Sequence, residues 1–453
     1  MSETRQIKEL KPYVPAAEIC RIYEETEDVA FLDSSLENEL GQYSILGLHP
    51  YLKLVKEEDG YTVNGKAGEG SFEEFVRQYL QEHSDPNETK LPIVSGAVGY
   101  FSYDYGREKE KIAAKDAANV EIPLAVLIFY DVFVVEETAA KRVWLIANGI
   151  TEDAGSCLEK LEREIRMEGG VQGVRQAPQS PAFRAEPNFE KEAYKQALEQ
   201  MIRYIIEGDI YIANMTQQFR IRSARTPAEA FHILRENNPS PFGGYLNYGT
   251  FQIVCASPER FLRVRDGRVE TRPIKGTRKR GATQQEDEAL RRELEQSGKD
   301  QSELLMIVDL ERNDLNRVCV PGSVKVTELF AVEAYATVFH LVSTVEGVLQ
   351  EGKTVMDLIE AAFPGGSITG APKYRAMEII DELEHGRRNL YTGSIGYLTL
   401  DGACDLNIVI RTALYKDGIY HLGVGGGITA ESETEFEYEE TLQKAKAILE
   451  ALR

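Results

Sequence analysis

Residues 397–424 read YLTLDGACDLNIVIRTALYKDGIYHLGV, and this stretch decides the fold class. Segments rich in strand-forming residues lie on both sides of two Asp-Gly dipeptides, at 401–402 and 417–418. Asp-Gly between such segments is typical of a two-residue hairpin turn. The stretch therefore predicts a meander of three antiparallel strands.

The same kind of pattern recurs outward from this stretch. Residues 251–255 and 261–274 are strand-like, and Asp266-Gly267 folds the second segment into a hairpin. Towards the N-terminus, residues 124–135 and 143–147 are separated by a polar turn and predict two paired strands.

Helix signals fall between these strands. A capping box at 71–74 opens a helix that runs to about residue 82, and one at 226–229 opens another with proline at its first position. Residues 189–207 predict a helix that stops at Gly208, and residues 435–453 predict an amphipathic one. Hairpin-joined strands with helices grouped between them predict an α+β fold with antiparallel sheets.

One break in composition divides the chain. Residues 168–187 are rich in Gly, Pro, Gln and Ala and show almost no periodic apolar pattern, which predicts a linker. The sequence therefore predicts an N-terminal domain at 1–167 and a C-terminal domain at 188–453.

The bulk composition excludes several classes of protein. The net charge of −22, from 74 acidic and 52 basic side chains, repels nucleic acid and anionic lipid surfaces. No apolar run approaches the length of a membrane span, and the N-terminus lacks a secretory signal. Five cysteines without CxxC spacing and six dispersed histidines predict neither a disulfide framework nor a metal site of these residues. We expect a reduced, cytoplasmic protein.

Two acidic pairs are candidates for holding a metal ion. Asp300 and Glu303 lie three residues apart on one predicted helix, as Glu437 and Glu440 do on another, so each pair shares a helix face. Carboxylates on rigid helices suit Mg²⁺, which keeps part of its water shell. Two solvated helix faces are the alternative interpretation.

Two further features are candidates for binding or catalysis. Lys275 lies at the end of a predicted strand between Pro273 and Gly276, where a desolvated amine would become nucleophilic, whereas most lysines at strand ends are only solvated. Residues 425–427 are all glycine and could offer backbone amides to a small carboxylate or could form a plain turn.

The C-terminal part also carries a series of short motifs: SPER at 257–260, RPIKGT at 272–277, MIVDL at 306–310, RND at 312–314, HLVS at 340–343 and PGGSITGAPK at 364–373. With the Gly-rich and acidic segments that follow, they occur in the order found in one family. The chain resembles the chorismate-utilising enzymes. That resemblance implies large antiparallel sheets forming a sandwich core with helices outside.

The resemblance also implies roles for individual residues. Glu303 and Glu437 would hold Mg²⁺ against the ring carboxylate of chorismate, with Glu440 and Asp300 close by. Arg411, on a strand at 410–412, would grip the enolpyruvyl carboxylate with its planar fork. Lys275 would be a covalent nucleophile and Glu259 the general acid for the departing ring hydroxyl. The remaining implied substrate contacts are His340, Thr369, Gly370, Tyr391, Gly425, Gly426, Gly427 and Lys444.

Position 275 separates the branches of the family. Lysine there is similar to aminodeoxychorismate synthases, which lead to para-aminobenzoate and folate, whereas anthranilate synthases commonly carry alanine. If Lys275 adds first at ring carbon two, ammonia can displace it at carbon four and the amine ends para to the carboxylate. Isochorismate and salicylate synthases place a lysine base in the strand that matches residues 211–218, and this chain has none there.

The resemblance has further consequences for partners and alternatives. The chain shows no cysteine–histidine pattern for hydrolysing glutamine, so ammonia would come from solution or from a glutamine amidotransferase subunit. Residues 31–34, Phe-Leu-Asp-Ser, resemble a tryptophan pocket of relatives that have Leu-Leu-Glu-Ser there. The alternatives are the component I of an anthranilate synthase and a non-catalytic regulator that binds chorismate or tryptophan.

Overall fold

The computed structural model describes residues 4–168, 183–335 and 338–453. Its helices are α1 (Ala16–Tyr23), α2 (Phe72–Glu82), α3 (Tyr103–Lys109), α4 (Ala154–Glu168), α5 (Lys191–Glu207), α6 (Pro227–Asn237), α7 (Gln284–Glu295), α8 (Gly298–Asn316), α9 (Val355–Ala362), α10 (Lys373–Leu383) and α11 (Thr434–Ala451). A short 3-10 helix, η1, spans Gly366–Ile368.

The strands of the N-terminal part are β1 (Gln6–Glu9), β2 (Val29–Asp33), β3 (Tyr43–Glu57), β4 (Gly60–Val63), β5 (Lys66–Ala67), β6 (Gly96–Phe101), β7 (Ala125–Glu137) and β8 (Arg142–Ala147). The predicted pairing of residues 124–135 with 143–147 is confirmed, because β7 and β8 are antiparallel neighbours.

The strands of the C-terminal part are β9 (Arg184–Pro187), β10 (Ile212–Arg222), β11 (Phe242–Asn247), β12 (Phe251–Ser257), β13 (Arg260–Arg265), β14 (Arg268–Thr271), β15 (Ile274–Lys279), β16 (Lys325–Ala334), β17 (Val338–Val348), β18 (Gly370–Ala371), β19 (Ser394–Thr399), β20 (Cys404–Asn407), β21 (Thr412–Lys416) and β22 (Ile419–Ile428). The hairpin predicted at Asp266-Gly267 joins β13 to β14.

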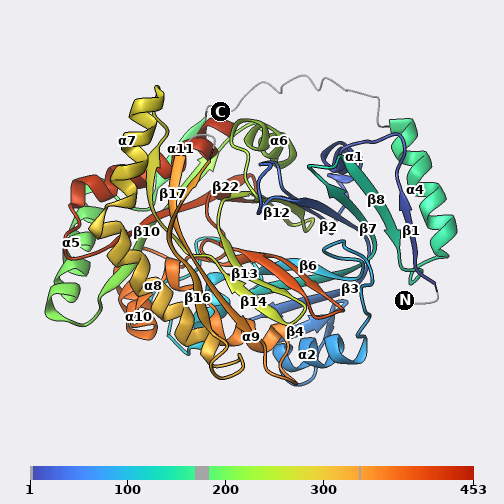
Figure 1. Cartoon of the computed structure of the whole chain (residues 1–453), viewed down its shortest axis with the longest axis horizontal. Coiled ribbons are helices and arrows are strands. Elements are labelled where there is room, and N and C mark those ends of the chain that lie inside the picture. The colour runs from blue at the N-terminus through green and yellow to red at the C-terminus, as the bar shows by residue number, and fades with distance from the viewer. Residues whose placement is uncertain (1–3, 169–182, 336–337) are drawn as a thin grey trace.

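The predicted antiparallel sandwich is confirmed. One continuous path of antiparallel pairings runs β10-β22-β21-β12-β11-β2-β3-β7-β6-β19-β20-β13-β14-β17, and β15 and β16 then both pair with β17. Figure 1 shows this path folded into two layers, with α5, α7, α8, α10 and α11 gathered outside one end and α1 and α4 outside the other.

The meander predicted for residues 397–424 is wrong. The stretch forms two separate hairpins, β19-β20 and β21-β22, and β20 pairs with β13 while β21 pairs with β12. The chain leaves one layer after β20 and enters the other at β21, and Arg411 takes a left-handed backbone conformation with φ of 50° at this crossing. Arg411 therefore lies just before β21, rather than on a strand at 410–412.

The N-terminal strands form the middle of the sheet path. β2 pairs with β11, and β6 pairs with β19, so hydrogen bonds join the two predicted domains on both sides. One buried cluster also combines residues from both, including Tyr100 and Ile128 with Ile253 and Leu414. The predicted linker lies mostly outside the described residues, and its last four residues form β9, which pairs with β10.

The predicted helix ends are confirmed where the structure records them. Ser71 accepts a hydrogen bond from the amide of Glu74, and Thr226 forms the full capping box with Glu229. Gly208 ends α5 with φ of 89°, a left-handed conformation that glycine adopts without steric cost. In the part of the chain that the structure describes, no helix is both long and apolar enough to cross a membrane.

Candidate active site

Lys275 lies on β15, beside a bulge in its pairing with β17. Lys275 is opposite Leu341, and the register shifts before Thr277. At the bulge, Gly276 has φ of 74°, and a Cβ there would lie 2.8 Å from the Cγ of Asp300. Glycine at 276 therefore allows α8 to approach the strand that carries the lysine.

The Lys275 amine points to a neutral partner. Its Nζ donates a hydrogen bond of 2.9 Å to the carbonyl oxygen of Ser367. Burial lowers the pKa of Lys275, while the nearby carboxylates of Glu303 and Glu259 act in the opposite direction. A lysine whose ammonium form is destabilised by desolvation is the kind that acts as a nucleophile.

Glu259 has the complementary shift. Its side chain is only 6% exposed, and burial raises the pKa of the Glu259 carboxyl, although hydrogen bonding to Ser367 and the charge of Lys275 oppose this. Desolvation therefore favours the neutral forms of both groups at once. A neutral amine beside a protonated carboxyl is the state that nucleophilic attack with acid-assisted departure requires.

The predicted metal carboxylates come from two helices. Glu303 on α8 and Glu437 on α11 are buried, and burial raises the pKa of each. Asp300 and Glu437 also raise the pKa of Glu303, and Glu440 raises that of Glu437, so the negative charges lie near one another. The structure thus places all four predicted carboxylates in one region.

Asp300 differs from the other three in having an arginine partner. It forms an ion pair with Arg278 at 3.0 Å, so its charge is already balanced. No three of the four predicted carboxylates have oxygens that all lie within 4.8 Å of one another. Magnesium commonly takes only one or two protein carboxylates, with water and substrate oxygens completing the shell, and Glu303 and Glu437 fit that use.

The three glycines at 425–427 make room for these side chains. A Cβ on Gly426 would lie 2.7 Å from Oε2 of Glu440 and 3.3 Å from Oε2 of Glu437. A Cβ on Gly427 would lie 3.3 Å from Nζ of Lys275 and 3.7 Å from Oε2 of Glu303. The glycine segment is therefore the wall along which the lysine and the carboxylates meet.

The amides of Gly425 and Gly427 face away from β10. Their partners in the register are Thr216 and Asn214, whose own amides donate elsewhere, to Glu384 and to the carbonyl of Thr369. In a non-hydrogen-bonded antiparallel pair, both residues point their amides away from the partner strand. Lys444 donates to the carbonyl of Gly425 at 2.9 Å and pairs with Glu440 at 2.8 Å, which balances part of the acidic charge.

Arg411 is the half-buried cation of the site. Its guanidinium has no hydrogen-bond or carboxylate partner among the described residues, and burial lowers the pKa of Arg411. His340, only 4% exposed, lies 2.9 Å from Thr277 Oγ1 through Nδ1, and burial together with Arg411 lowers the pKa of His340 to about 3. A neutral histidine beside an unpaired arginine is a suitable setting for an anionic ligand.

Three other predicted substrate contacts, Thr369, Gly370 and Tyr391, also make contacts within the protein in this region. Thr369 donates to the carbonyl of Gly365 at 2.8 Å, and Gly370 pairs with β10 so closely that a Cβ would lie 2.2 Å from the carbonyl oxygen of Ile212. Tyr391 packs against Gly423, where a Cβ would lie 2.1 Å from its ring.

Several residues that hold the site were not singled out from the sequence. Arg388 forms a buried ion pair with Glu384 at 2.7 Å and donates to the carbonyls of Ile368 and Asn214 at 2.7 and 2.6 Å. This network ties β10 to the segment that carries Thr369. Glu384 and Arg388 are four residues apart at the end of α10, and this spacing of opposite charges was a sequence signal for an ion pair.

A second pocket surrounds the predicted tryptophan segment. Leu32, Asp33 and Ser34 line it with residues of the C-terminal part, among them Phe242 and Tyr397. Asp33 forms an ion pair with Arg235 at 3.1 Å. Tryptophan binding in this pocket stays a prediction.

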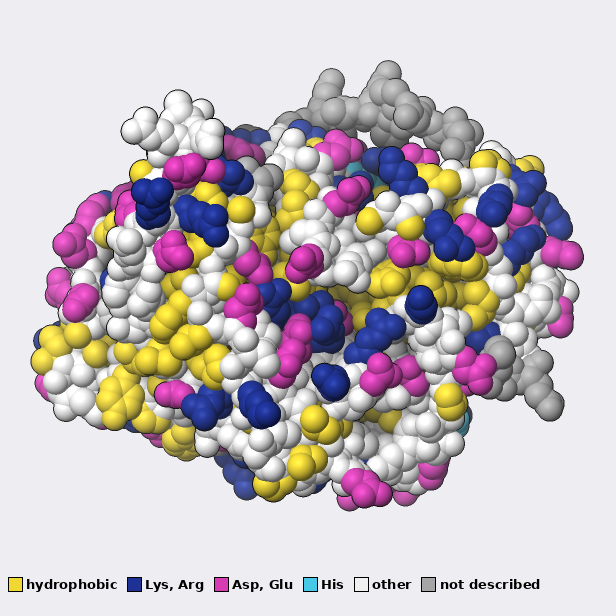
Figure 2. Space-filling view, in the orientation of Figure 1, with side chains coloured by type: hydrophobic (Ala, Val, Ile, Leu, Met, Phe, Trp, Pro, Cys, Tyr) yellow, Lys and Arg dark blue, Asp and Glu magenta, His cyan; other side chains and the backbone are white. Residues whose placement is uncertain are grey.

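Figure 2 shows Lys and Arg side chains gathered beside Asp and Glu side chains around a hollow near the middle of the face shown. The site thus combines a desolvated lysine and buried carboxylates with a buried histidine that lies near Arg411. Residues 35–450 match the family model of the chorismate binding enzymes. The chain belongs to this family and is a chorismate-utilising enzyme.

Individual relatives carry two different names. The chain is 39% identical over 422 residues to the aminodeoxychorismate synthase component 1 of Bacillus subtilis, covering 91% of this chain and 89% of that protein. It is also 39% identical over 437 residues to the anthranilate synthase component 1 of Thermus thermophilus, covering 94% and 93%. The solved structure of anthranilate synthase component I from Streptococcus pneumoniae matches with a TM-score of 0.82 at 30% identity, covering 91% and 93% of the two chains.

Proposed function

We propose that this chain aminates chorismate at ring carbon four, the reaction of an aminodeoxychorismate synthase component 1. The main support for this proposal is the setting of Lys275. Its Nζ donates a hydrogen bond of 2.9 Å to the Ser367 carbonyl and lies against Gly427. The charges of Glu259 and Glu303 act on its pKa. Sequence identity does not separate the two branches, because relatives of both names are 39% identical to this chain. The presence of lysine at position 275 supports the para-aminating branch over the ortho-aminating one.

The proposed first step uses Lys275 and Glu259. The neutral Nζ bonds to ring carbon two, the two ring double bonds shift, and the carbon–oxygen bond at carbon four breaks. Glu259 gives its proton to the departing hydroxyl, which leaves as water, and the Glu259 carboxylate then takes a proton from the new ammonium of the adduct. Burial favours the required protonation state of both groups.

The second step releases the lysine. Ammonia bonds to carbon four, the double bonds shift back, and the bond between carbon two and Nζ breaks while Glu259 protonates Nζ, so that Lys275 leaves as a neutral amine. The new ammonium at carbon four then returns a proton to the Glu259 carboxylate. The net change replaces a hydroxyl by an amine and forms water, and the enolpyruvyl group is retained.

We also propose that Glu303 and Glu437 hold Mg²⁺, and that Glu440 and Asp300 adjust the charge around it. When bound, Mg²⁺ would neutralise the ring carboxylate and make the ring more electrophilic. Arg411 and the outward amides of Gly425 and Gly427 would bind the enolpyruvyl carboxylate. The ammonia would come from a glutamine amidotransferase subunit, or from ammonium added to the purified chain.

The test is the identity of the product. The full chain is incubated with chorismate, ammonium and Mg²⁺, and products are separated and identified by mass and by fluorescence. We expect 4-amino-4-deoxychorismate from the wild type, and from Lys275→Ala loss of it or diversion to anthranilate. Lys279→Ala changes an exposed lysine of the same strand and is the matched control. Anthranilate from the unmutated chain would refute the para assignment and leave the family unchanged.

A further inference from the structure

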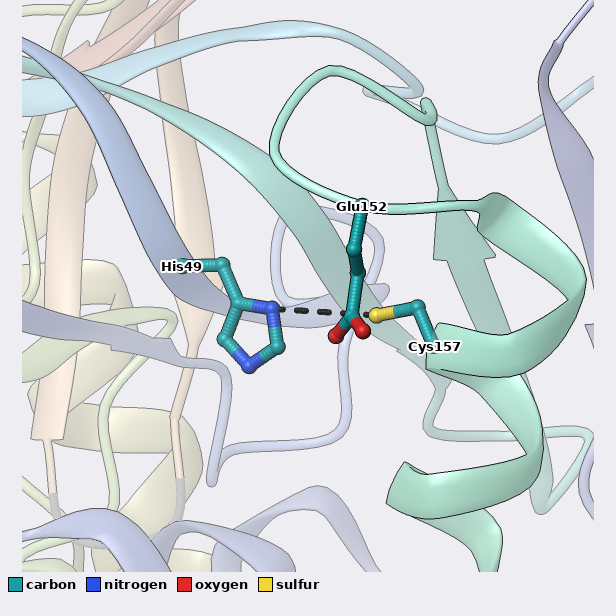
Figure 3. A group of neighbouring side chains, drawn as sticks. All are labelled: His49, Glu152 and Cys157. Carbon is teal, nitrogen blue, oxygen red and sulfur yellow. Dashed lines mark hydrogen bonds between the residues drawn. The ribbon is translucent and has the colours of Figure 1, made fainter.

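Three side chains with metal-binding atoms meet in the N-terminal part of the chain. His49 is on β3, Glu152 is in the loop after β8, and Cys157 is in the first turn of α4. Figure 3 shows the His49 ring and the Glu152 carboxylate pointing towards the Cys157 sulfur. None of these residues takes part in the proposed amination.

The backbone at His49 has an unusual conformation. His49 has φ of 54°, a left-handed conformation that is rare for residues other than glycine, next to the irregularity where the register between β3 and β7 shifts. That conformation departs from the regular strand geometry at the residue whose ring reaches Cys157. Strain of this kind concentrates at functional positions.

The loop and helix are fixed as well. Asp131 accepts hydrogen bonds from the amides of Ile150 and Thr151, at 3.0 and 2.7 Å, just before Glu152. The side chain of Asp153 then caps α4 by accepting from the amide of Ser156 at 2.9 Å. Glu152 and Cys157 therefore project from a rigid turn rather than from a free loop.

The spacing fits a tetrahedral ion. The Sγ of Cys157 lies 3.7 Å from Nδ1 of His49, and one oxygen of Glu152 completes a group whose atoms all lie within 4.8 Å of one another. Zinc bonds of about 2.3 Å to sulfur and 2.0–2.1 Å to nitrogen at the tetrahedral angle place those two atoms about 3.6 Å apart. The observed separation matches that edge.

We propose that His49, Glu152 and Cys157 form a binding site for a borderline-soft divalent ion such as Zn²⁺, with water as the fourth ligand. Thiolate and imidazole select zinc over magnesium, so this site differs in chemistry from the carboxylate site beside Lys275. Glu152 forms an ion pair with Lys160. Because the Lys160 side chain is exposed, a bound ion can displace it from Glu152. Without an ion, burial and Glu152 raise the pKa of the Cys157 thiol to about 12.

The test uses Co²⁺ and Zn²⁺ with the full chain in excess Mg²⁺, so that hard carboxylate sites are occupied. We expect one equivalent of Co²⁺ to give the sulfur-to-cobalt charge-transfer absorption of a thiolate ligand, and Zn²⁺ to abolish it by competition. His49→Ala and Cys157→Ser should each weaken Zn²⁺ binding at least tenfold, and Cys157→Ser should also remove that absorption. Amination activity should be unchanged in both variants.

Two matched variants control for nonspecific effects. Cys319→Ser alters another buried cysteine, and His83→Ala alters a histidine on a different helix end, and both should bind as the wild type does. Absence of the thiolate absorption in the wild type, or its persistence in Cys157→Ser, would overturn the site. Failure of the amination assay would leave this result untouched, because the readout is metal binding.

Discussion

Gly427 lies directly against Lys275: a Cβ on the glycine would be 3.3 Å from the lysine Nζ. The two residues belong to strands at opposite ends of the sheet path, β22 near its start and β15 at its finish. The site therefore forms where the folded sheet brings its two ends together. Substitutions in the glycine segment at 425–427 should consequently displace the lysine and the carboxylates.

Gly426→Ala tests that segment. The added methyl would meet Oε2 of Glu440 at 2.7 Å, so the acidic side chains must move. We expect the apparent Mg²⁺ affinity to fall by about 10- to 100-fold, as for other changes that disturb the support of metal ligands. Activity measured against Mg²⁺ concentration checks this. Gly298→Ala, in open space at the start of α8, should leave the titration unchanged.

The pH dependence of kcat/KM should be bell-shaped. Activity is lost as pH falls through the lowered pKa of Lys275, because the amine becomes protonated. Activity is also lost as pH rises through the raised pKa of Glu259, because the acid has given up its proton. A profile that stays flat on its acidic side would argue against Lys275 as the nucleophile.

Lys444→Met should move the acidic limb of this profile. The charge of Lys444 lowers the pKa of Lys275, so its removal raises that pKa and shifts the limb to higher pH. Lys446→Met removes an exposed lysine of the same helix and should leave the limb in place. Profiles of kcat/KM for the two variants, recorded side by side, make the measurement.

Arg411 should act mainly in binding. Arg411→Met removes a charged hydrogen-bonding partner worth about 1.5–3 kcal/mol, so KM for chorismate should rise by about 10- to 100-fold. Arg411→Lys keeps the charge and loses the planar fork, and its KM should fall between those of the wild type and Arg411→Met. Steady-state kinetics separates the effects on KM and kcat. A fall in kcat with unchanged KM would contradict the binding role.

Glu311 offers a prediction about stability. Burial raises the pKa of its carboxyl to about 8, although Thr271 donates a hydrogen bond to it at 2.9 Å. The folded chain holds a proton here that the unfolded chain releases, so this group costs stability as pH rises from about 4.5 to about 8. Glu311→Gln should therefore gain stability over the wild type between pH 5 and pH 8. Urea unfolding at both pH values checks this, with exposed Glu351→Gln as the control.

Local signals in the sequence predicted local structure well. The Asp-Gly turn at 266–267, the capping box at Thr226 and the stop at Gly208 are all present, because each depends on a few neighbouring residues. The meander failed because β20 and β21 are close in sequence yet pair with strands in different layers. Only tertiary packing decides that separation.

The candidate sites divide in the same way. Motif resemblance pointed to Lys275, Glu259 and the acidic helices, which the structure does bring together. The group of His49 and Cys157 had no sequence signal, because the two residues are separated by 108 positions. Metal-ligand spacing is recognisable in sequence only when ligands share one element or turn.

The order of the strands bears on how the chain is made. β2 and β6 leave the ribosome early, yet their outer edges are completed only by β11 and β19, which are synthesised much later. Until then both edges present unpaired backbone groups to other chains. Chaperones that cover these edges during synthesis should therefore matter more for this chain than for a protein built from two self-contained domains.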